Sequence, residues 1–332
     1  AYLDALLAEI RREDDALGPL DSIYLGGGTP SLMRPHRIAR LLEALGPRIG
    51  PATEISMEAN PESVDARALA GYRAAGVTRL SFGAQSFSPR LLAALDRQAR
   101  PEQVRDAVRC ARRAGFDSVS IDLLFGVPGQ EGADLDRDLA EVLALAPDHV
   151  SWYELEIKPA TALARMGVPP ADEDAAADAY RHVVESLEEA GYRWYETANF
   201  ARPGSECRHN LAYWSAADYL GVGIGAVSTI AGERRRNLPG LEDYIADLVA
   251  GREPRREREA LDDDTRRRER WMLALRRDDP LDLDWAGPPD RPEALTRLRH
   301  AGLIGGDPDY PALTREGRFV QNAVLHELIE YA

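Results

Sequence analysis

The chain has 332 residues, 44% of them hydrophobic, which is enough for one large domain and one small one. No window approaches the roughly 20 apolar residues of a membrane-spanning helix, and no apolar run follows a basic start, so we predict neither a transmembrane segment nor a signal peptide. The formal charge of −15 argues against non-specific nucleic-acid binding. Cys110 and Cys207 make neither a disulfide framework nor a CxxC metal site, and we predict a cytoplasmic protein.

Short apolar runs alternate with amphipathic segments over the first two thirds of the chain. The first amphipathic segment begins without a residue that could cap a helix, so we expect natural sequence upstream of Ala1. Repeated strand–helix units with buried strands predict a parallel sheet or barrel. The predicted strands are residues 22–25, 54–58, 78–82, 118–124, 149–155 and 192–196, and the predicted helices are residues 1–17, 32–48, 65–75, 88–95, 101–114, 134–145 and 172–190.

The pattern changes in the last third of the chain. A polar loop, residues 207–210, precedes a glycine-rich segment, residues 219–227, which we interpret as a buried strand and turn. The Arg, Glu and Asp run at residues 251–270 is interpreted as a solvated linker that leads into a helix. The tail is predicted to be a small, mostly helical, winged-helix-like module with helices near residues 265–276, 291–301 and 315–329 and short strands at 281–285 and 310–314.

Polar residues end four successive predicted strands. The first strand runs into three glycines at residues 26–28, where a ligand could contact bare backbone, although a tight connection is the simpler alternative. Glu58, Gln85 and Asp122 end the next three strands, and in a parallel barrel such residues point to one site. Each acid alone could be a helix cap. Together they suit a ligand with an ammonium group and hydroxyls, such as an amino acid joined to a ribose, whose carboxylate could pair with Arg97.

His209 precedes two aromatic residues, Tyr213 and Trp214. A neutral imidazole beside aromatic rings could ligate heme iron. The alternative is a hydrogen-bonded histidine in a turn.

Six segments, found in a fixed order, resemble those of a known family. The chain resembles the radical S-adenosylmethionine (SAM) proteins of the oxygen-independent coproporphyrinogen III oxidase family, and its HNxxYW segment resembles the heme chaperone branch. The resemblance covers most of the chain, and residues 313–318 fit the family's C-terminal domain. The segments are YLGGGTPS at 24–31, EANPE at 58–62, RLSFGAQSF at 79–87, DLLFGVPGQ at 122–130, HNLAYW at 209–214 and LGVG at 220–223.

This resemblance implies a partial (β/α)6 barrel of the radical SAM type over residues 1–235 and a helical, winged-helix-like domain over residues 236–332. It implies SAM and a [4Fe–4S] cluster as cofactors and, in the heme chaperone branch, heme bound near His209. Ala226 and Val227 would lie near the adenine of SAM. The residues that match the family's SAM contacts are Gly27, Gly28, Thr29, Glu58, Gln85, Arg97, Asp122, Ala226 and Val227.

The sequence departs from the family pattern at several positions. The CxxxCxxC motif that holds the cluster is absent and is expected upstream of Ala1, so the chain as given lacks the cysteines needed for SAM cleavage. Gln98 and Val227 stand where heme chaperones usually have histidine, and Lys158 replaces a common glutamate.

The leading hypothesis is a heme chaperone that passes heme to an acceptor protein. Its predicted partners are heme and that acceptor, and we predict no nucleic-acid partner. A homodimer is compatible with the family. Any membrane contact would be peripheral and would occur through the acceptor. The alternative is a radical SAM methyltransferase or a related SAM-dependent enzyme, because two usual histidines are missing. A scaffold that only binds SAM or heme is a third hypothesis, and coproporphyrinogen oxidation is disfavoured by the HNxxYW segment.

Overall fold

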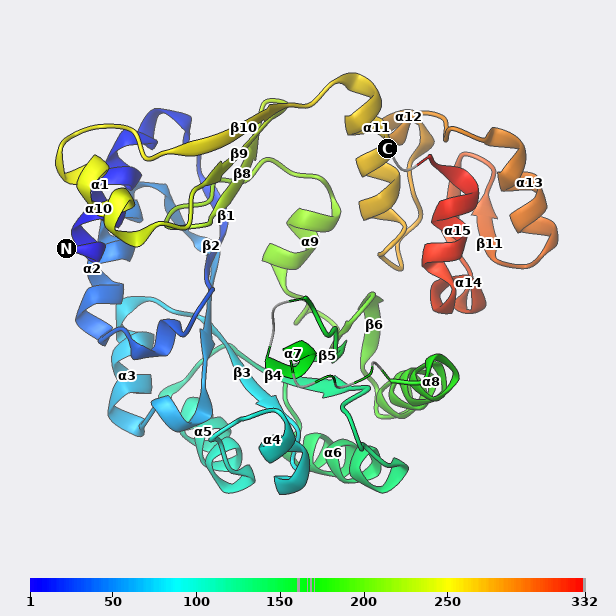
Figure 1. Cartoon of the computed structure of the whole chain (residues 1–332), viewed down its shortest axis with the longest axis horizontal. Coiled ribbons are helices and arrows are strands. Elements are labelled where there is room, and N and C mark those ends of the chain that lie inside the picture. Colours follow the sequence, from blue (N-terminus) through cyan, green and yellow to red (C-terminus); the bar gives the residue numbers. More distant parts are fainter. Residues whose placement is uncertain (160–161, 166, 168, 170, 331–332) are drawn as a thin grey trace. The chain divides into compact units, whose positions relative to one another are not determined.

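The computed structural model describes residues 1–159, 162–165, 167, 169 and 171–330 (Figure 1). The chain divides into two compact units, and each is described by itself. The first unit comprises Ala1–Asp21, His36–Thr53 and Arg208–Ala332, and the second comprises Ser22–Pro35 and Glu54–Cys207. The predicted domain boundary at residue 235 stays a prediction.

A seven-stranded curled sheet has the strand order β1-β2-β3-β4-β5-β7-β6. The neighbouring pairs from β2 to β5 are parallel, and β7 pairs antiparallel with both β5 and β6. This arrangement confirms the predicted partial barrel, although the sequence pattern did not reveal the three-residue strand β7. The strands are β1 (Leu20–Leu25), β2 (Ile49–Ala59), β3 (Arg79–Gln85), β4 (Ser118–Phe125), β5 (His149–Glu154), β6 (Arg193–Glu196) and β7 (Asn199–Ala201).

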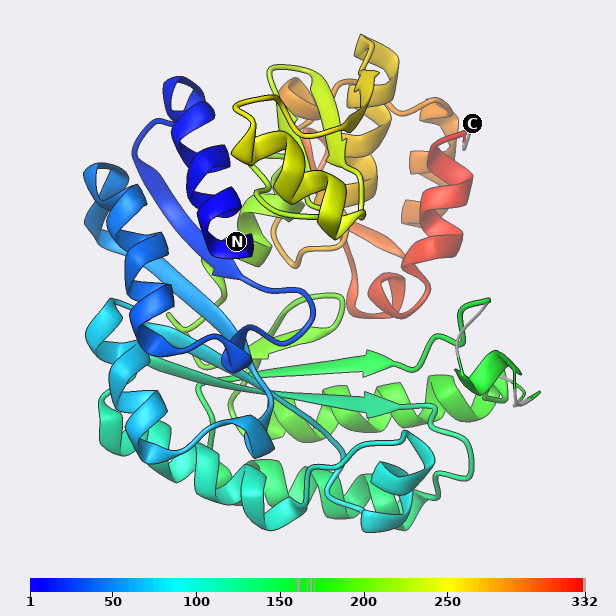
Figure 2. The ribbon, with the colours of Figure 1, turned by 60° about the vertical axis from the view of Figure 1, so that its left-hand side comes forward.

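The two faces of the sheet in the second unit differ in polarity, because successive side chains along a strand point to opposite faces. One face carries buried apolar residues such as Met57, Phe82 and Ile121, and helices pack on it (Figure 2). The other face carries acids, serines and a histidine, among them Asp122 and His149. The helices of this unit are α3 (Ala66–Ala75), α4 (Pro89–Ala94), α5 (Pro101–Ala114), α6 (Gly132–Leu145), α7 (Ala162–Arg165) and α8 (Glu173–Glu189).

Local capping sets the ends of two of these helices close to the predicted ones. The Asp65 carboxylate accepts a hydrogen bond of 2.7 Å from the backbone nitrogen of Ala68 at the start of α3. Gly76 ends α3 and Gly115 ends α5, both with a left-handed backbone (φ +110° and +79°) that glycine adopts without strain. The residues next to these helix ends were therefore enough to predict where the ends lie.

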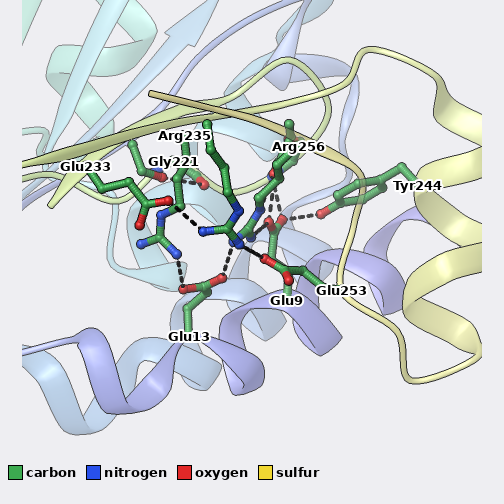
Figure 3. Close-up of polar contacts among 12 residues, drawn as sticks. Glu9, Glu13, Gly221, Glu233, Arg235, Tyr244, Glu253 and Arg256 are labelled. Atoms are coloured by element: carbon green, nitrogen blue, oxygen red, sulfur yellow. Dashed lines mark hydrogen bonds and ion pairs between the residues drawn. The ribbon is translucent and has the colours of Figure 1, made fainter. Parts of the chain in front are cut away.

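The first unit contains a second, three-stranded antiparallel sheet with the order β10-β9-β8. The interpretation of residues 251–270 as a solvated linker is wrong at residues 256–260, which form β10 and pair with β9. The Arg256 side chain lies inside the protein (Figure 3), with only 4% of it exposed, whereas the Arg258 side chain is 45% exposed. The other elements of this part are α1 (Tyr2–Arg12), α2 (Pro35–Leu45), α9 (Arg208–Trp214), β8 (Val227–Ile230), β9 (Glu233–Asn237), α10 (Leu241–Val249) and β10 (Arg256–Ala260).

The glycine-rich segment of the first unit also differs from the prediction. Residues 219–227 do not form a continuous buried strand; one isolated bridge joins Tyr219 to Thr229, and β8 begins at Val227. Gly223 and Gly225 have positive φ angles of +111° and +68°, which interrupt an extended strand.

The C-terminal part of the first unit is mostly helical, as predicted. Its described residues also form a hairpin and a separate apolar core around Trp271. The predicted strand at residues 310–314 is confirmed as β12. The predicted strand at residues 281–285 is wrong, because a short helix forms there. Asp282 caps this helix by accepting a hydrogen bond from the Asp284 nitrogen. Within the described part of the chain, no helix combines the length and hydropathy needed to cross a bilayer. The elements are α11 (Asp263–Ala274), α12 (Leu283–Ala286), α13 (Pro292–His300), β11 (Ile304–Asp307), β12 (Tyr310–Leu313), α14 (Arg315–Phe319) and α15 (Gln321–Leu328).

Candidate functional site

The glycine turn at the end of β1 is exposed and open. Gly27 and Gly28 have φ angles of +78° and +59°, so both occupy the left-handed region. No described atom lies within 4 Å of the position that a Cβ would take at either residue. Backbone groups of this turn are therefore accessible to a ligand. Thr29 continues the chain from this turn into a short 3-10 helix.

Glu58 holds this turn through both carboxylate oxygens. Its Oε1 accepts a hydrogen bond of 2.7 Å from the Tyr24 hydroxyl, and its Oε2 accepts one of 3.2 Å from the Gly27 nitrogen. Burial and the neighbouring Glu58 carboxylate raise the pKa of Tyr24 above its usual value, so this hydroxyl keeps its proton. Tyr24 therefore fixes Glu58 relative to the turn. The sequence indicates Tyr24 only as a strand residue and as part of the YLGGGTPS segment.

Asp122 is surrounded by hydroxyl groups on three neighbouring strands. Its two oxygens accept hydrogen bonds of 2.7 and 2.9 Å from Ser81 of β3, and further bonds come from Ser120 of β4 and Ser151 of β5. Burial raises the pKa of Asp122 to about 6 despite these bonds. The three serines were not predicted as site residues. Each serine lies two residues from another polar residue of its strand, and this spacing in the sequence could have indicated that they share one face of the sheet.

The other two predicted residues of the second unit lie at the end of β3 and beyond it. Gln85 ends β3 with a φ of +65°, an uncommon conformation for a residue other than glycine and one that clusters at functional sites. The Gln85 Nε2 and the Asn60 Oδ1 lie 2.8 Å and 3.8 Å from the position that a Cβ on Gly83 would take. Because Asn60 directly follows β2, the Gln85 amide lies near the end of β2. Arg97 is exposed, and among the described residues its side chain makes no ion pair.

A hydrogen-bonded row continues from Asp122 along the polar face of the sheet. The Ser120 hydroxyl lies 2.8 Å from the His149 Nδ1, and the His149 Nε2 lies 2.8 Å from the Tyr195 hydroxyl. Burial lowers the pKa of His149 well below its usual value, so this imidazole is neutral. Both of its nitrogens are occupied, which agrees with the structural role that the sequence suggested for His149.

The remaining predicted residues belong to the first unit. Ala226 accepts a hydrogen bond of 2.9 Å from the Asn237 nitrogen, and Val227 begins β8. His209 lies in the first turn of α9, not in an irregular turn as expected, and it is partly buried. Tyr213 lies four positions after His209, so the helix places both on one face, with ring centroids 4.8 Å apart. Burial lowers the pKa of His209 to about 4, which keeps the imidazole neutral at pH 7.

The C-terminal end of α9 contacts the residues that follow α11 in the same unit. Arg277 donates a hydrogen bond of 2.8 Å to the Ser215 hydroxyl, and the Arg276 guanidinium lies 5.8 Å from the ring centroid of Trp214. The Tyr213 ring packs against Tyr219 with a centroid distance of 4.5 Å. His209 is thus carried by a helix whose far end is held in place.

Comparisons with known proteins identify the family of the chain and confirm its fold. Residues 2–142 match the Radical SAM superfamily. The heme chaperone HemW of Mycobacterium tuberculosis is 38% identical over 338 residues, which cover 99% of this chain and 86% of that protein. The chain belongs to the HemW family of radical SAM proteins. HemW of Bacillus subtilis is 32% identical, with 98% of this chain and 90% of that protein covered. In fold, the chain resembles the coproporphyrinogen III oxidase HemN of Escherichia coli, with a TM-score of 0.85, 24% identity and coverage of 100% and 83% of the two chains.

Membership of the HemW family implies a [4Fe–4S] cluster, and the residues described do not fit one. Such clusters are normally held by three or four cysteines, whereas Cys110 and Cys207 are the two cysteines of the chain and both are free thiols. Among the described residues, no three His, Cys, Asp or Glu side chains converge as metal ligands would. We therefore derive no chemical step through the cluster from these residues.

We expect Asp122→Asn to stabilise the fold at pH 7 while it weakens SAM binding. The folded-state pKa of Asp122 lies near 6 and the unfolded value near 3.8, so the free energy of unfolding falls as the pH rises from about 4 to 6. At pH 7 the buried carboxylate is charged, and this charge lowers the free energy of unfolding. The neutral amide of asparagine carries no such charge but has one hydrogen-bond acceptor fewer. We therefore expect the free energy of unfolding to rise by about 1–2 kcal/mol in the variant. Urea unfolding of both proteins at pH 4 and pH 7 measures the difference, and calorimetry measures SAM binding. An unchanged SAM affinity would leave Asp122 with a purely structural role.

Proposed function

We propose that this protein is a heme chaperone, which binds heme and transfers it to an acceptor protein. The observation that carries the proposal is the 38% identity, over 99% of the chain, to a protein named heme chaperone HemW. The chemistry of α9 supports it, because His209 is a neutral imidazole with an aromatic neighbour on the same helix face. Neutral imidazole is a common axial ligand of heme iron. We also propose a cytoplasmic location.

We further propose that the second unit binds SAM around the glycine turn. The backbone of Gly27, Gly28 and Thr29 would receive the amino-acid end, while the Glu58 and Asp122 carboxylates suit an ammonium group and ribose hydroxyls. Gln85 adds an amide at the next strand end, and the Arg97 guanidinium suits the ligand's carboxylate.

Heme transfer can be tested with the full chain loaded with hemin. The loaded protein is mixed with an excess of an apo-cytochrome, and the transfer is followed from the Soret band. Direct transfer predicts a rate that rises with acceptor concentration, whereas simple release gives a rate that does not depend on it. A chain that takes up no hemin in a saturable manner would overturn the proposal.

A SAM-dependent radical enzyme is the second candidate. The hydroxyl-rich polar face of the sheet favours it, since Ser81, Ser120 and Ser151 offer groups that could bind an organic substrate near Asp122. Gln98 and Val227, which replace the usual histidines, point the same way. Saturable SAM binding without saturable hemin binding would favour this candidate over the heme chaperone.

A further inference from the structure

The chain makes a sharp corner in the second unit, where β3 ends. The pairing of β3 with β4 shifts its register between Gly83 and Gln85, so Ala84 is the extra residue of a β-bulge. Gln85 then has a φ of +65°. The Ser86 nitrogen donates a hydrogen bond of 2.8 Å to the Ala84 carbonyl, only two residues earlier. Residues 84–87 are called the β3 corner below.

The β3 corner directs the Gln85 side chain to the polar face of the sheet. Gly83 lies opposite Asp122 in the register of β3 and β4, and opposite residues of neighbouring strands point to the same face. The Gln85 Nε2 lies 2.8 Å from the position of a Cβ on Gly83, so its amide takes the space that a side chain there would fill. A positive φ at a residue other than glycine persists only where the surrounding structure enforces it. Some neighbouring group must therefore hold this corner.

Asp138 of α6 holds the β3 corner through both carboxylate oxygens. Its Oδ1 accepts a hydrogen bond of 2.6 Å from the Phe87 nitrogen, and its Oδ2 accepts one of 2.8 Å from the Ser86 hydroxyl. The Ser86 oxygen also accepts a hydrogen bond of 3.0 Å from the Ser88 nitrogen, at the start of α4. Asp138 and Ser86 are completely buried. Water cannot easily replace the carboxylate, so its loss would leave buried donors without an acceptor.

Packing of α6 does not explain a carboxylate at position 138. Leu135 and Val142, which share this face of the helix, are buried and apolar. Burial raises the pKa of Asp138 to about 6, although the hydrogen bonds from Phe87 and Ser86 lower it. A buried carboxylate is costly unless it is hydrogen-bonded, and the two donors of the β3 corner meet that need.

We propose that Asp138 is a positioning residue for SAM, because it holds the β3 corner in the conformation that presents the Gln85 amide to the ligand. This inference rests on the proposed function, which assigns Gln85 to the SAM site. Asp138 does not touch the ligand, since none of its surface is exposed. It acts on the two residues that directly follow Gln85, and both of its hydrogen bonds lie within the second unit.

The test compares Asp138→Ala with Asp134→Ala. Asp134 is a matched control, because it lies one turn earlier on α6, is also buried, and bonds to Ser88 and Arg90, which follow the β3 corner. If these acids only fasten α6 to α4, both variants should lose thermal stability and keep their SAM affinity. The proposal instead predicts that the SAM affinity, measured by calorimetry, falls about 10-fold in Asp138→Ala and stays within about 2-fold of the wild type in Asp134→Ala.

Two measurements on the ligand-free chain follow the corner itself. Hydrogen exchange of the Phe87 backbone amide should accelerate about 10-fold in Asp138→Ala and not in Asp134→Ala. The NMR signal of the Gln85 side-chain amide, assigned by its loss in Gln85→Ala, should move only in Asp138→Ala. The conservative variant Asp138→Asn keeps an acceptor for the Phe87 amide, so its SAM affinity should stay within about 3-fold of the wild type.

Equal SAM affinities in the two alanine variants, or an unmoved Gln85 signal in Asp138→Ala, would overturn the proposal. Should Asp138→Ala fail to fold, Ser86→Ala removes one donor of the corner, and we expect a shifted Gln85 signal and a SAM affinity about 3-fold lower. Unchanged values in Ser86→Ala would then overturn it.

Failure of the proposed function gives a different result. The wild type would then bind no SAM, and the positioning role of Asp138 would fall with it, whatever the Gln85 signal shows. If the wild type binds SAM, Gly27→Val loses it and Asp138→Ala keeps the wild-type affinity, only the positioning role is wrong.

Discussion

The His209→Ala variant should lose most of its specific hemin binding, with an affinity at least about 10-fold lower than that of the wild type. The imidazole is the candidate iron ligand, and methyl cannot replace it. Because burial lowers the pKa of His209 to about 4, a proton does not compete for the ring nitrogen until the pH approaches that value. The wild-type Soret band should therefore persist from pH 8 to about pH 5 and decline as the pH falls through about 4. Spectrophotometric hemin titrations of both proteins measure this.

His182→Ala is the matched control for loss of a histidine. His182 lies on α8, its side chain is 48% exposed, and it pairs with Asp136 at 2.9 Å. Removing it should leave the Soret titration unchanged, which separates loss of a ligand from non-specific hemin adsorption to surface histidines. Equal hemin affinities in His209→Ala and the wild type would exclude His209 as the ligand. In that case the heme chaperone proposal would need another iron ligand.

Much of the second unit could be predicted because its signals are local. Asp65 and Gly76 bound α3 within ten residues of sequence, and the apolar runs that contain Met57 and Ile121 are buried strands. The order of the strands follows the order of the chain from β1 to β5, so the residues at their carboxyl ends belong to neighbouring strands. The assignment of these residues to SAM stays a prediction.

The corrections concern segments whose structure depends on distant partners. The sequence predicts a charged linker at residues 256–260 because the local pairing of Arg256 with Glu253 does not reveal a buried arginine. Glu9 and Glu13, which also pair with Arg256, lie more than 240 residues earlier in the chain. His209 was placed in an irregular turn because the run from Arg208 to Trp214 is too short to show helical periodicity. The composition of a short stretch of sequence cannot reveal that Arg256 pairs with residues as distant as Glu9 and Glu13.

The Gly27→Val variant should fail to bind SAM in a calorimetric titration that gives saturable binding with the wild type. Gly27 has a φ of +78°, and its missing Cβ leaves open space beside the exposed backbone of the turn. A valine there would place a branched side chain in the space proposed for the ligand, and it would also strain the backbone by about 1–3 kcal/mol. The strain shifts the position of the Gly27 nitrogen, which is bonded to Glu58 at 3.2 Å. Both effects act on binding in the same direction.

Gly115→Val separates the two effects because Gly115 matches Gly27 in conformation. Its φ is +79°, no described atom lies within 4 Å of its missing Cβ, and it lies in the same unit at the end of α5. The two variants should therefore lose similar amounts of thermal stability, while only Gly27→Val loses SAM. If Gly115→Val also fails to bind SAM, backbone strain in the second unit is the cause and contact at the turn is not. If Gly27→Val binds SAM as the wild type does, the glycine turn is only a tight connection, and the ligand of the polar strand ends must be sought elsewhere.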